Sequence, residues 1–525
     1  MRQLYLFAAL SLHLTAFAQF TLEHTYTGES GIVRIRLENS GEKYYGVNDA
    51  THQIMLYNAD HTFWKSIPIT PTNAEFTYVR HLSESKIDPD ADIEVAYYSG
   101  YYVGSTPTYI AKVVREDGSE ILNVPGAKSI ELSQLEGLPD KIITKKTDGT
   151  SQVFDLLGNL EHNYAEGTVS RTKLENSGEK YFVIDSPANA LKVLNSDHSL
   201  WKTVALAKPA IANYIYVRLV SETQVNTDPL LEVSYTYSQM LNGSTYYESK
   251  LVNENGSLLM TAPFCSEIFF SHFDGYPDKV MTRDVHPLSV VSASVYSLPS
   301  LNLEHVYPTL TYRAIMENAG ERYYTIIPDN GQCKVYHGDH TLYKSINLPV
   351  PASITNLAID QVSQNRVNND DLVEVSYGYN QSIAGIFYYE RKLINELGTV
   401  LLTVPDCLNL SMLGAPNLPD KPIGLMYIEN SGYFGSVYGQ NLSVENFSEN
   451  QQFLYPNPAN QKLHINSGSK IIAVEIYNLT GSLVKKLEGI SILDVCTADF
   501  PAGLYLLTLT DSNNKKSNHK IMISH

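Results

Sequence analysis

Hydrophobic and polar residues follow the short, alternating pattern of half-buried β-strands along most of this chain. In one stretch such runs occupy 180–184, 190–194 and 200–206, and Asn, Asp, Ser and Pro separate them. Turn residues at this spacing predict antiparallel hairpins. No segment combines a sustained period of 3.6 residues with helix caps, so the chain is predicted to be all-β.

The strand pattern occurs three times. The segment 37–45 returns, with conservative changes, at 174–182 and at 316–324, at offsets of 174 − 37 = 137 and 316 − 174 = 142 residues. Three further blocks keep this spacing: an Asp-His-x-x-Trp/Tyr-Lys block starting at Asp60, Asp197 and Asp339, a Glu-Val strand at Glu94, Glu232 and Glu374, and a Pro-Asp-Lys turn at Pro139, Pro277 and Pro419. The body is therefore a triplicated array with repeats of about 19–158, 159–300 and 301–442.

Each repeat holds enough hairpins for about three groups of three or four strands, at roughly 45 residues per group, which is the blade length of a β-propeller. The array therefore predicts a β-propeller of about nine short blades. Three separate β domains are the alternative, which the absence of Gly/Ser/Pro-rich linkers disfavours. A Leu-Glu-His-x-Tyr strand at 21–26 recurs at 159–164 and 302–307, with a degenerate copy at 441–447. A spare strand at one end can complete a blade begun at the other.

The first 18 residues have the features of a secretory signal peptide. Arg2 gives the positive start, 4–14 is mostly apolar, and Ala16-Phe17-Ala18 places cleavage before Gln19. The apolar run is too short to span a bilayer, and no later stretch approaches the required length. We expect export, with no transmembrane segment in the mature chain.

The last 73 residues form a separate module behind a polar stretch, 443–452, that is suited to a linker. Its separated motifs comprise Tyr455, Pro456, Asn457 and Pro458, then Gly481 of a Leu-Thr-Gly turn, Gly503 and Tyr505 of a Pro-Ala-Gly-Leu-Tyr run, and Lys520 of the closing strand. Alternating strands joined by these turns predict a small antiparallel sandwich of roughly seven strands.

This set of motifs closely resembles the type A sorting domain of type IX secretion, known from Bacteroidetes. The resemblance implies recognition by the outer-membrane translocon, removal by a sorting peptidase near the linker, and then attachment to surface lipopolysaccharide or release. It therefore implies passage through the periplasm to the cell surface or the medium. The triplicated body resembles only uncharacterised secreted proteins that carry the same module, and no activity comes with that resemblance.

The net charge excludes one class of partner, and the cysteine positions indicate the state of the thiols. The formal net charge is -18 and no stripe of Lys and Arg is present, so nucleic acid is not an expected partner. Of the four cysteines, Cys265 and Cys407 hold the same position in two repeats, which keeps them apart. Most of the four are predicted to be buried free thiols.

No HExxH, GxSxG, P-loop or dinucleotide-binding motif is present, and we assign no catalytic, cofactor-binding or metal residue. The Asp-His block could act as an acid and base or hold a metal, but Asp in a tight turn bonds the backbone, so a structural role is preferred. The block also faintly resembles the structural Asp-box hairpin of sialidase-type propellers. Acidic turns at 88–92, 226–228 and 368–371 could ligate calcium, although none has EF-hand spacing.

Tyrosine is abundant, with 37 residues, and often paired. Tyrosine combines an apolar face with a polar tip, which suits sugar recognition, but one member of each pair on a strand faces the core. The candidate ligand contacts are Tyr45, Tyr98, Tyr102, Tyr247 and Tyr389. The sequence favours a non-enzymatic surface binding or scaffold protein for a carbohydrate or protein. The alternative is a polysaccharide-active hydrolase or lyase with its site at the ring centre.

Overall fold

The computed structural model describes residues 20–524 apart from 89, 91, 227, 242, 286–290, 365, 368–369, 384–385, 414–419, 429–431, 441–452, 456–458, 467–469, 479–481, 490–491 and 513–515. The predicted signal peptide, 1–18, lies outside the described residues. The chain divides into two compact units, 1–441 and 442–525.

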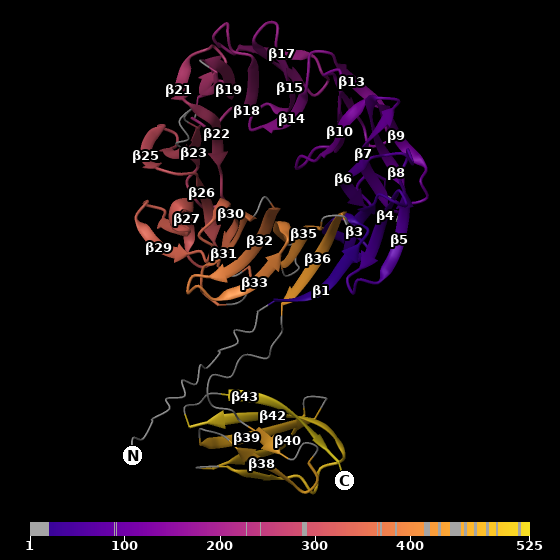
Figure 1. Ribbon diagram of the computed structural model, residues 1–525, viewed down its shortest axis with the longest axis vertical. Coiled ribbons are helices and arrows are strands. Elements are labelled where there is room, and N and C mark those ends of the chain that lie inside the picture. The colour runs from indigo at the N-terminus through magenta and orange to yellow at the C-terminus, as the bar shows by residue number, and fades with distance from the viewer. Residues whose placement is uncertain are drawn as a thin grey trace, which may run out of the picture. The chain divides into compact units, whose positions relative to one another are not determined.

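The first unit consists of nine four-stranded antiparallel sheets that follow one another around a ring (Figure 1). We number these sheets blades 1 to 9. The first repeat supplies blade 1, with β2 (Ser30–Leu37), β3 (Gly41–Asn48), β4 (Gln53–Asn58) and β5 (Phe63–Pro68); blade 2, with β6 (Phe76–Ser83), β7 (Glu94–Val103), β8 (Thr106–Arg115) and β9 (Glu120–Pro125); and blade 3, with β10 (Ala127–Ser133), β11 (Lys141–Lys146), β12 (Ser151–Phe154) and β13 (Leu160–Tyr164).

The second repeat supplies blade 4, with β14 (Val169–Leu174), β15 (Gly178–Asp185), β16 (Ala190–Asn195) and β17 (Leu200–Ala205); blade 5, with β18 (Tyr214–Ser221), β19 (Glu232–Leu241), β20 (Ser244–Asn253) and β21 (Leu258–Pro263); and blade 6, with β22 (Cys265–Ser271), β23 (Lys279–Val285), β24 (Val291–Ser297) and β25 (Asn302–Tyr307).

The third repeat supplies blade 7, with β26 (Thr311–Met316), β27 (Gly320–Ile327), the short 3-10 helix η1 (Pro328–Asn330), β28 (Gln332–His337) and β29 (Leu342–Asn347); blade 8, with β30 (Ile354–Ser363), β31 (Glu374–Ile383), β32 (Ile386–Asn395) and β33 (Val400–Pro405); and blade 9, with β34 (Cys407–Leu413), β35 (Lys421–Ile428), β36 (Gly432–Gln440) and β1 (Phe20–Thr27). The predicted all-β array of about nine blades is confirmed.

The first strand of each blade lies toward the ring centre and the fourth lies at its periphery (Figure 1). The apolar side chains pack mainly between neighbouring blades. Between blades 4 and 5, for example, Val193 and Val204 share one buried cluster with Val220 and Val233. Because each blade buries its faces against two neighbours, the stability of the array is distributed around the ring.

A tight turn explains the glycine of the repeated Glu-Asn-Ser-Gly segment. Gly41, Gly178 and Gly320 have φ values of 73°, 69° and 70°, in the left-handed region. Glycine reaches this region without the steric cost that a Cβ imposes. The turn joins the first two strands of blades 1, 4 and 7, so it sets their hairpin geometry in every repeat.

The two ends of the array meet in blade 9. The N-terminal strand β1 pairs antiparallel with β36, from Phe20 opposite Gln440 to Thr27 opposite Phe434. Phe20 and Tyr26 are buried there. The expected completion of a blade by a strand from the other end is therefore present. The degenerate copy at 441–447 lies outside the described residues, and β1 occupies the place that β13 and β25 take in blades 3 and 6.

The second unit is a two-sheet sandwich. One sheet contains β37 (Phe453–Tyr455), β38 (Lys462–Asn466) and β41 (Asp494–Cys496); the other contains β40 (Leu483–Glu488), β39 (Ile471–Asn478), β42 (Gly503–Asp511) and β43 (Lys516–Ile523). Val474, Ile476, Leu507 and Ile521 are among the residues of its buried core. The predicted sandwich of roughly seven strands is confirmed.

All four cysteines are free thiols, and Cys265, Cys333 and Cys407 are buried while Cys496 is exposed. This agrees with the prediction of mostly buried thiols. Within the described part of the chain, no helix has the length and apolar character needed to cross a membrane.

Candidate functional site

The repeated Asp-His block is a structural turn. Asp197 Oδ1 accepts a hydrogen bond from the backbone N–H of Ser199 at 3.0 Å and another from its hydroxyl at 2.6 Å. His198 follows with φ = 64°, and Asp60 and Asp339 make the same contacts with their turns. These bonds hold the pKa of the Asp197 carboxyl below its usual range. The aspartates therefore fix the turn, as their sequence context predicts.

The rest of the block also contributes to packing. The Nζ of Lys180, on β15, lies 4.8 Å from the centroid of the Trp201 ring. The Nζ of Lys202, the next residue after Trp201, lies 4.4 Å from the same centroid. Trp64 and Tyr343 each have two cations in the equivalent places. Lys202 in turn pairs with Glu254 of blade 5. The block therefore joins adjacent blades, and its acid/base or metal-binding interpretation is not needed.

Exposed aromatic side chains lie instead on the innermost strands of blades 2 and 5. On β6, Tyr78 is 55% exposed, and on β18 Tyr214 and Tyr216 are 61% and 51% exposed. Tyr78 and Tyr216 hold equivalent positions, five residues before Ser83 and Ser221. We call Phe76, Tyr78 and Tyr98 of blade 2, together with Tyr214 and Tyr216 of blade 5, the inner aromatic face.

The rings of the inner aromatic face contact one another. The Tyr78 ring centroid lies 5.3 Å from those of both Phe76 and Tyr98, and the Tyr214 and Tyr216 rings are stacked at 6.4 Å. Alternation along β6 and β18 places these side chains on one side of each strand. The exposed residues Arg80 and Arg218 follow two positions after Tyr78 and Tyr216. Each strand therefore presents aromatic rings followed by a cationic donor.

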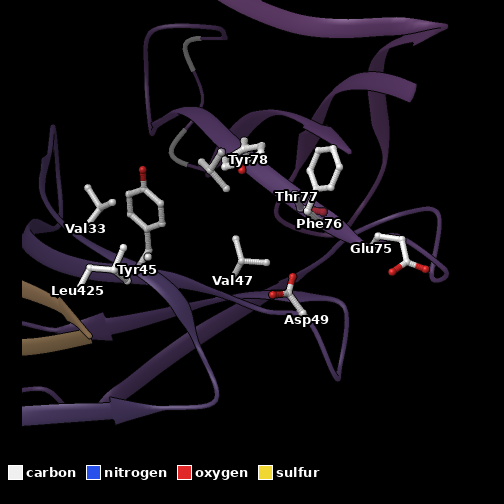
Figure 2. Close-up of a pocket in the computed structure, with 11 residues that line it drawn as sticks. Val33, Tyr45, Val47, Asp49, Glu75, Phe76, Thr77, Tyr78 and Leu425 are labelled. Carbon is white, nitrogen blue, oxygen red and sulfur yellow. The ribbon is translucent and has the colours of Figure 1, made fainter. Parts of the chain in front are cut away.

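A cavity of about 540 Å³ adjoins the inner aromatic face at the junction of blades 1 and 2. Figure 2 shows Tyr45 and Val47 of blade 1 on one part of its wall and Phe76 and Tyr78 of blade 2 on another. Asp49 and Glu75 also line it. A neighbouring cavity of about 320 Å³ shares lining residues with the first and extends the depression onto blade 9.

The predicted tyrosines fall at different places. Tyr45 lines the larger cavity, Tyr98 contacts Tyr78, and Tyr102 is exposed near the tip of β7. Tyr247 and Tyr389 are half-buried on β20 and β32, six residues before Asn253 and Asn395. The sequence candidates therefore include two members of the cavity region and three that lie elsewhere on their hairpins.

Sequence reasoning missed Phe76, Tyr78, Tyr214 and Tyr216 because they are not adjacent aromatic pairs. Their signal is the alternating Phe-Thr-Tyr-Val-Arg of 76–80 and Tyr-Ile-Tyr-Val-Arg of 214–218. The third repeat lacks this signal, since Asn356, Ala358 and Asp360 take the corresponding positions.

Asp360 replaces the exposed arginine of the other two repeats and is itself paired. Arg391 donates a hydrogen bond to its Oδ1 at 2.8 Å, while burial raises the pKa of Asp360 to about 6. The inner aromatic face is therefore confined to two of the three repeats.

The sorting-motif residues lie in the second unit. Tyr505 is buried and its hydroxyl donates to the Pro501 carbonyl at 2.9 Å. Gly503 begins β42, Tyr455 ends β37, and Lys520 stands opposite Leu506 in the β42–β43 pair. Outside the described residues lie Pro456, Asn457, Pro458 and Gly481.

Comparison with known proteins identifies the second unit. Residues 453–524 match the family of secretion system C-terminal sorting domains. The protein is therefore secreted or displayed at the cell surface. No curated protein sequence matches this chain.

Solved structures resemble the chain only weakly. Dihydro-heme d1 dehydrogenase NirN has 10% identity and a TM-score of 0.38, over 73% of this chain and 78% of its own. BamB from Moraxella catarrhalis has 9% identity and a TM-score of 0.30, over 79% and 99%. An extracellular domain from B. thetaiotaomicron has 10% identity and a TM-score of 0.27, over 96% and 72%. Similarity at this level carries no functional argument.

Proposed function

We propose that this protein is a non-enzymatic, secreted or surface-displayed carbohydrate-binding protein, and that its inner aromatic face is the binding surface. The observation that carries the proposal is the placement of Tyr78 and Tyr216, each more than half exposed, at equivalent positions on the innermost strands of two repeats. Clustered exposed aromatic side chains mark interaction sites, so a repeated exposed pair on the inner strands supports a ligand-binding role.

The chemistry of this surface suits a sugar. Tyrosine rings offer a flat apolar face with a polar hydroxyl at the edge, which matches the C–H face and the hydroxyl rim of a pyranose. Arg80 and Arg218 add guanidinium donors for sugar hydroxyls on the same strands, and the Nε of Arg218 also lies 3.6 Å from an oxygen of Glu267. The net charge of -18 disfavours a highly anionic polymer. A neutral or weakly charged polysaccharide therefore fits better.

Two equivalent surfaces on one ring favour a polymeric ligand. If blades 2 and 5 each hold a segment of the same chain, the second binding event is intramolecular and the overall affinity exceeds that of either surface. A protein partner remains the alternative ligand for the same aromatic side chains, since tyrosine is also enriched in protein interfaces.

One observation favours an enzymatic alternative, a polysaccharide hydrolase or lyase. Asp49 and Glu75 both line the 540 Å³ cavity beside Tyr45 and Tyr78 (Figure 2), and glycoside hydrolysis uses two apposed carboxyl groups. The corresponding sequence positions are Ser186 and Asn213 in the second repeat and Pro328 and Thr355 in the third, so these two carboxylates occur together in the first repeat alone. A single asymmetric pair is what catalysis would require.

Binding of the mature chain, Gln19 onward, to a panel of polysaccharides tests the proposal when reducing-sugar release is measured in the same wells. We expect retention without product. The Tyr78→Ala and Tyr216→Ala variants should each weaken retention, and the double variant should lose it. Phe63→Ala removes a similarly exposed aromatic from the outer strand β5 and serves as the control.

Product release that Asp49→Asn or Glu75→Gln abolishes would replace the proposal with the enzymatic alternative. Retention that survives the double tyrosine variant would place the binding surface elsewhere. No retention of any polysaccharide would leave a protein partner as the better hypothesis.

A further inference from the structure

A buried glutamate occupies the same place in each of the three repeats. Glu94, Glu232 and Glu374 begin the second strand of blades 2, 5 and 8, and their side chains are no more than 1% exposed. Burial raises the pKa values of these carboxyls to about 8, 7 and 8. An ionised carboxylate at this depth needs a compensating charge or a full set of hydrogen bonds.

Of the three buried glutamates, Glu94 has the fewest hydrogen bonds to its carboxylate. Among the residues that the structure describes, neither of its carboxylate oxygens has a hydrogen-bond partner, and the Oγ of Ser83 opposite it in the sheet has none either. In the later repeats, Ser221 and Ser363 each donate to one carboxylate oxygen, at 3.0 and 3.2 Å, and leave the other oxygen without a partner.

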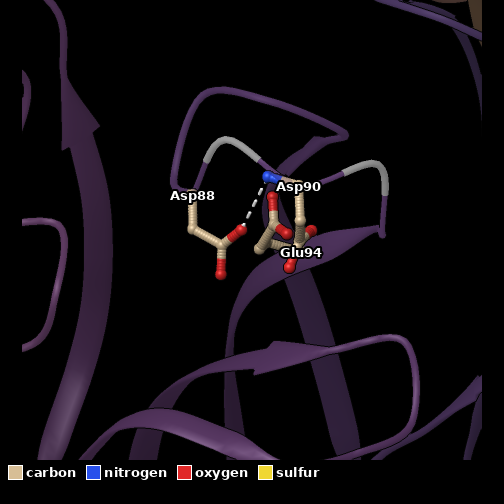
Figure 3. A group of neighbouring side chains, drawn as sticks. All are labelled: Asp88, Asp90 and Glu94. Carbon is tan, nitrogen blue, oxygen red and sulfur yellow. Dashed lines mark hydrogen bonds between the residues drawn. The ribbon is translucent and has the colours of Figure 1, made fainter.

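Two more carboxylates converge on Glu94 from the loop that precedes β7. Asp88 and Asp90 each place an oxygen so that these atoms and one of Glu94 all lie within 4.8 Å of one another. Figure 3 shows the three side chains together, with the backbone N–H of Asp90 donating to Asp88 Oδ1 at 3.1 Å. Asp88 and Asp90 reach solvent, so the buried carboxylate forms the floor of an accessible acidic loop.

We propose that Asp88, Asp90 and Glu94 form a binding site for a divalent cation, of which calcium fits best. Calcium–oxygen distances are 2.3–2.6 Å, so oxygens on opposite sides of the ion are about 4.8 Å apart. The three oxygens therefore fit one coordination sphere. Carboxylates are hard ligands, and the absence of His or Cys from this cluster disfavours zinc. The site does not depend on the proposed carbohydrate function.

The charges around the site match a doubly charged ion. With Glu94 ionised by the bound cation, three carboxylates and Arg115, whose Nε lies 3.3 Å from Asp88, give −3 + 1 = −2. Asp92 adds another negative charge to the loop. In the later repeats the positions of Asp88, Asp90, Glu94 and Arg115 are taken by Asn226, Asp228, Glu232 and Asn253, and by Asn368, Asp370, Glu374 and Asn395, each set giving −2. These four positions thus carry −2 in every repeat, and Asp92 makes the first loop more acidic than the other two.

Calcium at this loop would act on the binding surface of blade 2. The loop connects β6, which carries Tyr78, to β7, which carries Tyr98. A cation held by Asp88 and Asp90 on one side and by the first residue of β7 on the other would fix the connection between these two strands. The cation would also supply a positive charge next to the buried Glu94 carboxylate, which has no hydrogen-bond partner in the described part of the chain. The folded chain should therefore gain stability when the ion binds.

Calcium titration of the mature, EDTA-treated chain by isothermal titration calorimetry, with a parallel thermal melt, tests the site. We expect saturable binding of at least one ion and a higher melting temperature with calcium. Asp90→Asn and Glu94→Gln should each weaken one class of sites about tenfold or more, because ligand charge sets calcium affinity. Asp90 is exposed, so its variant retains the fold even if the buried Glu94→Gln does not.

Asp117→Asn is the matched control. Asp117 lies in the exposed β8–β9 turn of the same blade, where it accepts from the backbone of Ser119 at 2.8 Å, and its replacement changes the net charge equally. Three outcomes would overturn the proposal: no calcium binding at millimolar concentration, binding that both site variants leave unchanged, or an equal loss in the Asp117→Asn control.

Discussion

The hydroxyl of Tyr164 lies 2.6 Å from Nδ1 of His198 and thereby joins the outermost strand of blade 3 to a turn of blade 4. Equivalent pairs link Tyr26 to His61 and Tyr307 to His340, at 2.8 and 2.9 Å. Each pair lies where the fourth strand of blade 9, 3 or 6 meets the next blade, a few residues after the start of a sequence repeat. Two blocks that recur separately in the sequence therefore meet in one inter-blade joint in each repeat.

Replacing Tyr164 with Phe should lower stability by about 1 kcal/mol, since the joint loses one buried hydrogen bond and the imidazole nitrogen is left without its partner. The thermal midpoint of the mature chain measures the change. Tyr102→Phe, at an exposed position on β7, removes a hydroxyl with no inter-blade role and should leave the midpoint unchanged. Equal midpoints for Tyr164→Phe and wild type would show that the joint adds no stability.

Acidification should destabilise the same joints. Burial lowers the pKa values of His61, His198 and His340 below their usual 6.5. Above pH 6.5 the imidazoles are neutral in both folded and unfolded chains, so they add no pH dependence there. Below it, the unfolded chain takes up protons that the folded chain resists, and the free energy of unfolding falls as the pH falls.

The measurement compares thermal midpoints at pH 7.5 and 5.5 for wild type and for a chain with all three histidines replaced by Asn, which tolerates the positive φ of these turns. The loss on acidification should be smaller in the variant. Other titrating groups are common to both proteins and cancel. An equal loss would place the acid sensitivity elsewhere.

Lys202→Met should cost about 1–2 kcal/mol through the lost cation–π contact and ion pair together. Lys202 stacks on Trp201 and pairs with Glu254, whose Oε2 also accepts the backbone N–H of Leu231 at 3.0 Å. Lys192→Met is the control because Lys192 pairs only with acidic groups at the surface. Denaturant unfolding followed by tryptophan emission suits both variants; equal losses would contradict the assigned role of Lys202.

Only one thiol of the native chain should react rapidly with Ellman's reagent. Burial raises the pKa of Cys265 to about 11 and of Cys333 and Cys407 to about 12, whereas Cys496 is exposed in the second unit. The thiolate is the reactive species, so the three buried groups are protected. We expect one equivalent under native conditions and four in guanidinium. Native reaction of two or more thiols would contradict the burial of the blade cysteines.

Thiol reactivity also reports processing. Because Cys496 belongs to the sorting domain, a chain from which this domain has been removed should show no rapid reaction and three equivalents after denaturation. The same assay on culture supernatant and on full-length protein distinguishes the two forms.

Much of the fold was predictable because strand formation here is a local matter. The expected strands at 190–194 and 200–206 correspond to β16 and β17, which end within one residue of the predicted bounds. The number of blades followed from counting hairpins. The blade boundaries did not coincide with the repeats, since the opening strand of the second repeat is β13, the fourth strand of blade 3. Strand partnership across a repeat boundary is a non-local property that local patterns cannot fix.

The candidate site was less predictable for the same reason. Alternation indicates that Tyr78 and Thr77 face opposite sides of β6, but it does not say which side contacts a neighbouring blade. The pattern of adjacent tyrosines indicates Tyr247 and Tyr389 as candidates. The exposed rings of Tyr214 and Tyr216 are separated by one residue, so this pattern does not include them. The burial of Glu94 could not be predicted either, because alternation along its strand allows the side chain to face the ring centre or the solvent.

Blade 9 is built from strands at both ends of the array, so it needs the whole array to be present. It brings together residues as far apart as Thr25 and Ser436, whose hydroxyls lie 3.1 Å apart across 411 positions of the chain. Joining ends this distant costs about 4 kcal/mol more in loop entropy than closing a hairpin of about four residues, unless the intervening blades have already brought them together. We therefore expect blade 9 to form after the blades that lie between its two parts. A chain that stops early leaves β1 without its partner strand and the preceding blade uncovered, open to proteolysis and to aggregation. Because β1 pairs with β36, blade 9 can be completed only in a chain synthesised to the end of the third repeat.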